Sequence, residues 1–320
     1  MAVYTRVAAE QFRPLAAELG LDALSPLEPV PQGIENTTYF FTARRHEGAP
    51  ADYVLTLVED YSSERVRFAA ALTRHLCRTG LPVPAPLENR AGEAIHSLAG
   101  RQALVFPRVD GRSVEHVDAC HCEIIGDFLA RAHLAGDNLG LASTNPRGLL
   151  WLNEARGLLE PRLAPGEYAL LGEQTERYRR VCEADPELPL GAIHGDLFRD
   201  NALFREEVLT GVIDFYQACS DWLLLDVAIV ANDWCSNADG DMDRNRLDAL
   251  LTAYHHNRPF TRRERQYWQD ILCFAATRFW VSRLLADPAA NGNAAKAEKD
   301  PGEYRDKLQA RMIGCPPLPH

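Results

Sequence analysis

The stretch His194-Gly195-Asp196-Leu197-Phe198-Arg199-Asp200-Asn201 decides the interpretation of this 320-residue sequence. Short strands are expected at 191–194 and 202–204, at the two ends of this stretch. Asp214 lies farther along, at the end of another short strand expected at 209–214. The sequence therefore predicts two polar loops, each at the end of a short strand.

The residue types in these loops suit phosphoryl transfer, which needs a group that orients the attacking hydroxyl and oxygen ligands for metal ions. Asp196 can accept the hydroxyl proton, and Asn201 and Asp214 offer one neutral and one charged oxygen to Mg²⁺. The spacing agrees with the kinase pattern H-x-D-x-x-x-x-N, and Asp214-Phe215-Tyr216 stands where protein kinases have D-F-G. The alternative is that both aspartates are ordinary loop or cap residues. The ordered set predicts a small-molecule kinase that uses ATP.

The rest of the chain predicts an α+β fold of the protein kinase-like, bilobal type. Extended runs at 37–42 and 53–58 predict an antiparallel hairpin, and short strands are expected at 94–98 and 101–106. Helical periodicity is found at 6–19, 62–78, 120–136, 151–159, 167–183, 221–235, 243–256, 262–286 and 302–311. We expect a β-rich nucleotide-binding lobe at 1–106 and a helical catalytic and substrate lobe at 107–320.

Composition and net charge narrow the classes of molecule that the protein is expected to bind. The net charge of −11 and the pI near 5.4 disfavour nucleic acid or an anionic membrane as the main partner, because both attract basic surfaces. No apolar run reaches membrane-spanning length, and no signal peptide is recognised. His116, Cys120, His121 and Cys122 lack the paired spacing of a zinc site. We expect a cytoplasmic enzyme with a small-molecule partner, and the sequence does not reveal its oligomeric state.

Segments along nearly the whole chain resemble the aminoglycoside phosphotransferase and choline kinase-like fold, and within it the bacterial homoserine kinase family that is unrelated to the GHMP type. The matching segments are 33–40, 53–59, 80–84, 193–201, 213–218, 232–235 and 278–284. Of these, Asn232-Asp-Trp-Cys and Arg278-Phe-Trp-Val-Ser-Arg-Leu separate this family from its relatives. The resemblance implies that ATP and L-homoserine react to give O-phospho-L-homoserine, a step toward threonine.

The resemblance also implies roles for particular residues. Asp196 is expected to be catalytic, and Asn201 and Asp214 to bind Mg²⁺. The ATP-binding residues implied in the phosphate loop, the third strand of the small lobe and the hinge near adenine are Gly33, Asn36, Thr37, Thr38, Thr56, Phe106 and Val109.

Thr56 departs from the wider fold, because many relatives carry a Lys or Arg there that pairs with the ATP phosphates. The resemblance implies that the homoserine kinase family shares this threonine. The cation that meets the phosphates is therefore left open. Arg199 in the catalytic loop is one candidate, and Arg65 or Arg67 is another.

Homoserine carries a carboxylate and an ammonium, so its site should offer a guanidinium and an acidic group. We predict that Asp233 binds the ammonium and Arg283 the carboxylate, with a structural salt bridge between the two as the alternative. Asp221 and Asp226 are expected to anchor loops and helix ends.

Two other functions stay open. The first is a kinase of the same fold that acts on another small hydroxyl compound, such as choline or an aminoglycoside. The second is a catalytically silent nucleotide-binding protein, which the missing basic residue at Thr56 motivates. The second predicts a lost catalytic Asp or lost metal ligands, yet Asp196, Asn201 and Asp214 are all present.

Overall fold

The computed structural model describes residues 5–30, 36–46, 48–184, 187–286 and 299–320. The chain divides into two compact units. Unit 1 comprises Met1–Ser113, Asn138–Ser143 and Asp200–Cys219, and unit 2 comprises Val114–Asp137, Thr144–Arg199 and Ser220–His320. The division falls inside the short turn η1 (Arg199–Asn201), which is the last part of the 194–201 segment.

Unit 1 is built on an antiparallel sheet. Its strands are β1 (Leu21–Asp22), β2 (Glu28–Pro29), β3 (Thr37–Arg45), β4 (Pro50–Val58), β5 (His96–Leu98) and β6 (Arg101–Pro107). The order is β1-β3-β4-β6-β5, with β2 also paired to β3. Buried and half-buried residues alternate along the first part of β3, as expected for a strand with two different faces. The predicted hairpin of extended runs is thus confirmed as β3 and β4.

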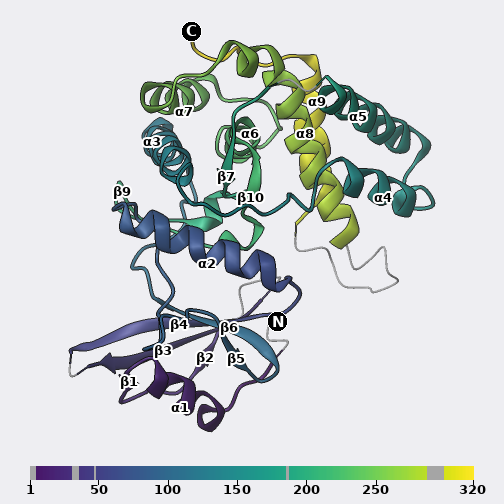
Figure 1. Cartoon of the computed structure of the whole chain (residues 1–320). Helices are drawn as coiled ribbons and strands as arrows, with labels where there is room; N and C mark the ends of the chain where they lie inside the picture. Colours follow the sequence, from purple (N-terminus) through teal and green to yellow (C-terminus); the bar gives the residue numbers. More distant parts are fainter. Residues whose placement is uncertain (1–4, 31–35, 47, 185–186, 287–298) are drawn as a thin grey trace. The chain divides into compact units, whose positions relative to one another are not determined.

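Each face of this sheet is covered by one helix (Figure 1). α1 (Ala9–Glu18) packs Phe12 and Leu15 against one face, where Phe41 and Leu55 belong to the same apolar cluster. α2 (Ser63–Arg78) packs Val66 against the other face, beside Leu104. Burial of these apolar faces, at about 25 cal/mol per Å², holds the small unit together.

A second, two-stranded sheet completes unit 1. β8 (Ala202–Arg205) and β9 (Val208–Val212) form an antiparallel hairpin, and the short turn η2 (Phe215–Gln217) follows. The amide of Val212 donates to the carbonyl of Pro82 at 2.8 Å, which fastens β9 to the segment after α2.

Unit 2 is mainly helical. Its helices are α3 (Ala119–Gly136), α4 (Leu149–Leu159), α5 (Pro165–Glu183), α6 (Leu223–Trp234), α7 (Arg244–Asn257), α8 (Arg262–Ala286) and α9 (Pro301–Ile313). β7 (Leu190–Ile193) pairs with β10 (Cys219–Trp222). All residues of α6 are buried, so this helix is the centre of the unit. α8 packs against α6 and α9, and Figure 1 shows α8 and α9 side by side.

The predicted helices are confirmed with small shifts at their ends, but one boundary was wrong. Helical periodicity was assigned from residue 221, whereas β10 extends to Trp222 and α6 begins at Leu223. At the start of α3, His121 contacts Asp118, the N-cap residue of the helix, and Cys122 is buried, so these residues begin a helix as predicted.

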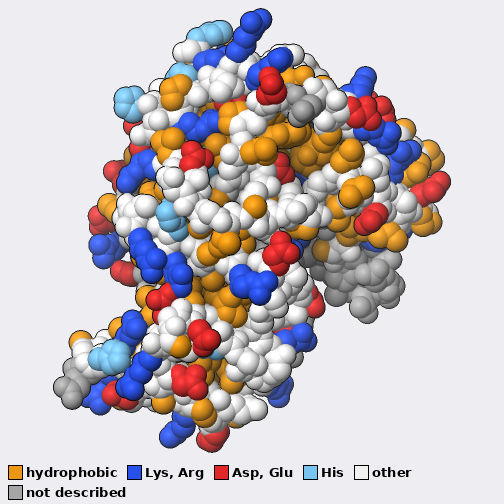
Figure 2. Space-filling model, in the orientation of Figure 1, with side chains coloured by type: hydrophobic (Ala, Val, Ile, Leu, Met, Phe, Trp, Pro, Cys, Tyr) orange, Lys and Arg blue, Asp and Glu red, His pale blue; other side chains and the backbone are white. Residues whose placement is uncertain are grey.

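None of the helices described in the structure is long and apolar enough to cross a membrane. Figure 2 shows acidic and basic side chains interspersed over the face drawn.

Candidate functional site

The loop that carries Asp196 is held in place by one buried carboxylate, that of Asp226 on α6. Oδ2 of Asp226 accepts from the amide of His194 at 2.8 Å, and Oδ1 accepts from the amide of Gly195 at 2.9 Å. Nε2 of His133 lies 3.1 Å from Oδ2. Burial alone would raise the pKa of Asp226, but these contacts outweigh it and the pKa lies below its ordinary value. The expectation that Asp226 anchors a loop is confirmed.

The turn itself depends on Gly195, whose φ of +75° lies in the left-handed region that glycine adopts without steric cost. His194 supports the residue two positions on, because its Nδ1 accepts a hydrogen bond from the amide of Asp196 at 3.2 Å. The side chain of Asp196 is half-buried. The loop therefore offers one carboxylate from a backbone that is fixed on both sides.

The end of the loop is fixed by two neighbouring residues of α6. Oδ2 of Asp233 accepts from the amide of Arg199 at 2.9 Å and from its Nε at 3.2 Å. Nε1 of Trp234 donates to the carbonyl of Leu197 at 3.1 Å. Two residues of the Asn232-Asp-Trp-Cys motif thus hold the loop that carries Asp196, a role that the sequence did not predict for this motif.

Asn201 and Asp214 stand at the same end of the β8–β9 hairpin. Ala202 pairs with Val212, and the carbonyl of Asn201 accepts from the amide of Ile213 at 2.9 Å. Asp214 is exposed and adopts a left-handed φ of 64°. One carboxylate and one amide oxygen on adjoining segments form a hard donor set. These residues fit Mg²⁺, which takes few protein oxygens and completes its shell with phosphate and water.

Three of the residues expected to contact ATP share one face of the main sheet. Thr38 pairs with Thr56, Thr56 pairs with Leu104, and Phe106 lies two residues beyond Leu104. Because side chains two apart in a strand point to the same side, all three face the side covered by α2 and Tyr216. Burial raises the pKa of the Tyr216 hydroxyl, Asp214 raises it further, and Thr56 interacts with it. Thr56 therefore makes a neutral contact with Tyr216.

The predicted phosphate loop is only partly described, since Gly33 lies outside the described residues. Oδ1 of Asn36 accepts from the amide of Glu59 at 3.3 Å. Thr37 faces the opposite side of the sheet from Thr38, and its hydroxyl donates to Glu59 at 2.6 Å. These two side chains anchor the base of the loop.

The predicted hinge segment is packed on the β8–β9 hairpin, which lies between Asn201 and Asp214. A Cβ at Gly211 would come within 2.7 Å of Cγ1 of Val109, so glycine is needed for this close approach. Beyond it, Arg112 and Phe204 exchange backbone hydrogen bonds of 2.9 and 2.8 Å. Val109 is thereby fixed relative to β9, and through it to the segment of Asp214.

The candidate cations have different surroundings. Nη2 of Arg65 donates to the carbonyl of Tyr216 and to Oε1 of Gln217, both at 2.9 Å. Arg67 is exposed, and Arg199 is engaged by Asp233. Arg65 thus holds the turn that follows Asp214.

The predicted substrate residues have separate partners. Nη1 of Arg283 lies 2.6 Å from Glu303 on α9, whereas Asp233 is paired with Arg199. Lys307 of α9 also binds Glu303, at 2.6 Å. The role of α9 had no sequence signal, because a Glu and a Lys four residues apart are common on solvated helices.

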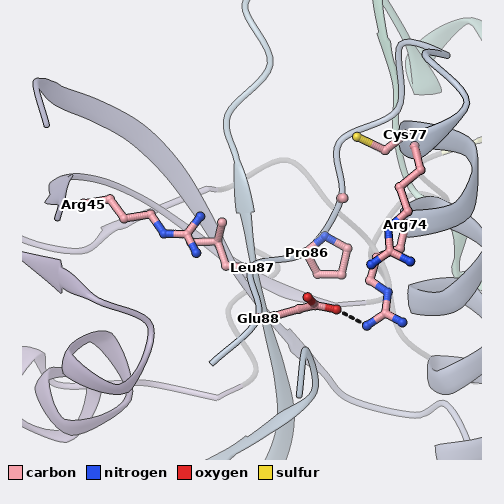
Figure 3. A pocket seen from close by; sticks show the side chains of 8 residues that line it. Arg45, Arg74, Cys77, Pro86, Leu87 and Glu88 are labelled. Carbon is pink, nitrogen blue, oxygen red and sulfur yellow. Dashed lines mark hydrogen bonds and ion pairs between the residues drawn. The ribbon is translucent and has the colours of Figure 1, made fainter. Parts of the chain in front are cut away.

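A surface pocket of about 250 Å³ lies in unit 1 and contains none of the predicted site residues (Figure 3). In Figure 3 Arg74 of α2 turns toward Glu88, and Arg45 comes from β3. The lining residues are Arg45, Arg74, Cys77, Arg78, Ala85, Pro86, Leu87 and Glu88.

The phosphotransferase enzyme family matches residues 26–267, which is more than half of the chain. The chain belongs to the phosphotransferase enzyme family. Full-length relatives of this phosphotransferase include the homoserine kinase of Janthinobacterium sp. (strain Marseille), 38% identical over 99% of this chain and 98% of that one. The homoserine kinase of Pseudomonas aeruginosa (strain UCBPP-PA14) is 40% identical over 98% of this chain and 97% of that one.

Solved structures show the same fold for this phosphotransferase. Amicoumacin kinase hAmiN, in complex with AMP-PNP, Ca²⁺ and Ami, is similar with a TM-score of 0.67 and 16% identity, over 95% of this chain and 92% of that one. A choline/ethanolamine kinase family protein from Mesorhizobium loti is similar with a TM-score of 0.63 and 18% identity, over 90% of this chain and 87% of that one. The predicted α+β, protein kinase-like fold with a β-rich small lobe and a helical large lobe is confirmed.

Proposed function

We propose that this phosphotransferase is a homoserine kinase, which transfers the γ-phosphoryl group of ATP to the side-chain hydroxyl of L-homoserine. The products are ADP and O-phospho-L-homoserine. The observation that carries the proposal is the agreement in length and sequence with relatives named homoserine kinase, at 38–41% identity over nearly the whole chain. Other kinases of the fold are less than 25% identical and support the fold alone.

The catalytic role falls to Asp196. Its carboxylate accepts or aligns the proton of the attacking hydroxyl, and the Asp226 clamp supports this role because it fixes the preceding peptide groups. Phosphoryl transfer depends mainly on positioning and on charge stabilisation, so a fixed loop is an advantage. With its hydrogen bonds to Asp226 intact, the loop holds the Asp196 carboxylate in place, and little reorganisation is needed during the reaction.

Asn201 and Asp214 would hold Mg²⁺, which when bound neutralises charge on the ATP phosphates. Thr38, Thr56 and Phe106 would line the nucleotide side of the sheet, and the hinge up to Val109 would bound the adenine. The common face of the first three residues supports this assignment. Arg199 is assigned to the loop end, where its pairing with Asp233 orients a guanidinium beside the catalytic segment.

The test is ADP release measured with homoserine, serine, threonine, choline and kanamycin in parallel. We expect homoserine to give the highest kcat/KM of the panel. An enzyme that releases ADP with choline or kanamycin but not with homoserine would show that the acceptor has been misassigned. Asp196→Asn serves as the control, because it should lose turnover with every acceptor and still bind Mg·ATP.

A further inference from the structure

Tyr304 of α9 is fully buried, yet its hydroxyl has no hydrogen-bond partner among the residues that the structure describes. An unpaired hydroxyl in the protein interior is unfavourable, and most buried polar groups find a partner. Such a group in a folded enzyme calls for an explanation, and a bound ligand that completes the hydrogen bond is one.

The ring of Tyr304 is held in a fixed orientation. Phe198 of the catalytic loop lies parallel to it at 6.0 Å between centroids, and Phe279 of α8 lies at 5.4 Å. Cζ of Arg283 and Nζ of Lys307 lie 4.5 and 4.4 Å from its centroid. The ring cannot turn its hydroxyl elsewhere without disturbing these contacts.

The surroundings of the hydroxyl connect it to both ends of the proposed acceptor. Burial raises the pKa of Tyr304 well above its ordinary value, Asp233, Glu303 and Asp196 raise it further, and Arg283 opposes them. The hydroxyl therefore stays protonated and serves as a donor. It lies within electrostatic reach of the proposed catalytic Asp196 and of Asp233, the residue predicted for the ammonium.

The neighbouring charges are already ordered without ligand. Glu303 binds Lys307 with one oxygen and Arg283 with the other, each at 2.6 Å. Together with the Arg199–Asp233 pair and Asp196, this group holds three cations and three anions.

We propose that Tyr304 donates a hydrogen bond from its hydroxyl to the carboxylate of the amino-acid acceptor, beside Arg283, and so selects amino acids over amino alcohols. The inference rests on the proposed function, because it takes homoserine as the acceptor. α9 then contributes a specificity-determining residue to the reaction, and the ligand supplies the partner that the hydroxyl lacks.

The experiment uses Tyr304→Phe, which removes one oxygen and keeps the ring. We expect the KM for homoserine to rise about tenfold or more, as for a lost hydrogen bond to a charged group. The KM for ATP should stay unchanged and kcat within about twofold. The inhibition constant of 3-aminopropan-1-ol, which has no carboxylate, should also change less than about twofold.

Tyr178→Phe is the matched control, since it removes another buried hydroxyl of unit 2, one that interacts with Cys182 and not with this group. Its KM for homoserine should equal that of the unsubstituted enzyme. Without ligand, Tyr304→Phe should unfold at the same temperature or higher, because the removed hydroxyl had no partner to lose.

An unchanged KM for homoserine in Tyr304→Phe, with a homoserine-active unsubstituted enzyme, would overturn this inference and leave the proposed function standing. An equal rise in the inhibition constant of 3-aminopropan-1-ol would overturn it too, as would a clear loss of thermal stability. If the unsubstituted enzyme shows no homoserine-dependent ADP release, the proposed function itself is wrong.

Discussion

Replacing Asp226 by Asn tests whether one buried carboxylate positions the catalytic loop. The carboxylate accepts the amides of His194 and Gly195 and contacts His133, and its side chain is 0% exposed. Asn keeps the size but has a single acceptor oxygen, so its NH₂ group must face a donor. One unsatisfied buried donor costs about 1–3 kcal/mol, and loss of the charge weakens the remaining bonds. We expect a total loss of about 2–4 kcal/mol in the free energy of unfolding.

The same substitution should lower kcat on the order of 10- to 100-fold, because Asp196 directly follows the loosened peptide groups and a displacement of about 1 Å costs about 100-fold. Denaturant unfolding and ADP release would be measured together, with Asp221→Asn as the control. Asp221 is half-buried and accepts hydrogen bonds from Asn145 and from the amide of Trp222, and desolvation raises its pKa, so neutralising it should cost less. Equal losses of kcat in both variants would refute the reasoning, as would an Asp226→Asn enzyme with normal kcat and stability.

The remaining predictions concern Asp196, Asp214 and Glu303. Asp196→Asn should reduce kcat at least 100-fold. Its affinity for Mg·ATP, measured by titration calorimetry, should stay within about threefold of that of the unsubstituted enzyme. Near-normal turnover would show that Asp196 is not the catalytic residue. Asp214→Asn should weaken Mg²⁺-dependent nucleotide binding. Asn tolerates the left-handed backbone at this position, so the loss would be due to the missing charge and not to backbone strain. An unaltered Mg²⁺ dependence would contradict the metal assignment. Burial alone would raise the pKa of Glu303, but Lys307 and Arg283 lower it from 4.5 to about 2. The stabilisation of the fold by ionised Glu303 is therefore complete above pH 4.5 and is lost as the pH falls toward 2. The thermal midpoint of Glu303→Gln should therefore approach that of the unsubstituted protein at low pH. A difference between the two midpoints that does not change with pH would contradict this.

Long periodic segments could be predicted from the sequence because their apolar faces repeat over many residues. α8 was predicted with the boundaries it has in the structure, and β3 and β4 were recognised from β-branched and aromatic runs. β1 and β2 were missed, since two residues carry no measurable alternation. Asp221 and Trp222 of β10 were assigned to the helix, because no Gly or Pro separates them from the apolar run that begins at Leu223. The boundary between β10 and α6 is set by the pairing of β10 with β7, and such pairing cannot be predicted from the local sequence.

The candidate site divides in a similar way. Asp196, Asn201 and Asp214 could be selected because their order and spacing are tied to one chemistry. The partner of Asp233 could not be predicted, because the choice between Arg199 and Arg283 depends on which helix face meets the loop. Tyr304 carried no signal either, since a buried hydroxyl without a partner exists only in the folded chain.

The backbone amides of His194 and Gly195 should exchange their hydrogens with solvent unusually slowly for loop amides. Loops normally exchange through small local openings. Here both amides donate to a carboxylate on α6, a helix buried on all sides, so opening them requires the core of unit 2 to come apart. By conformation this segment is a loop, but its exchange rates should be those of the core. Asp196 is thus presented from one of the least mobile parts of the unit.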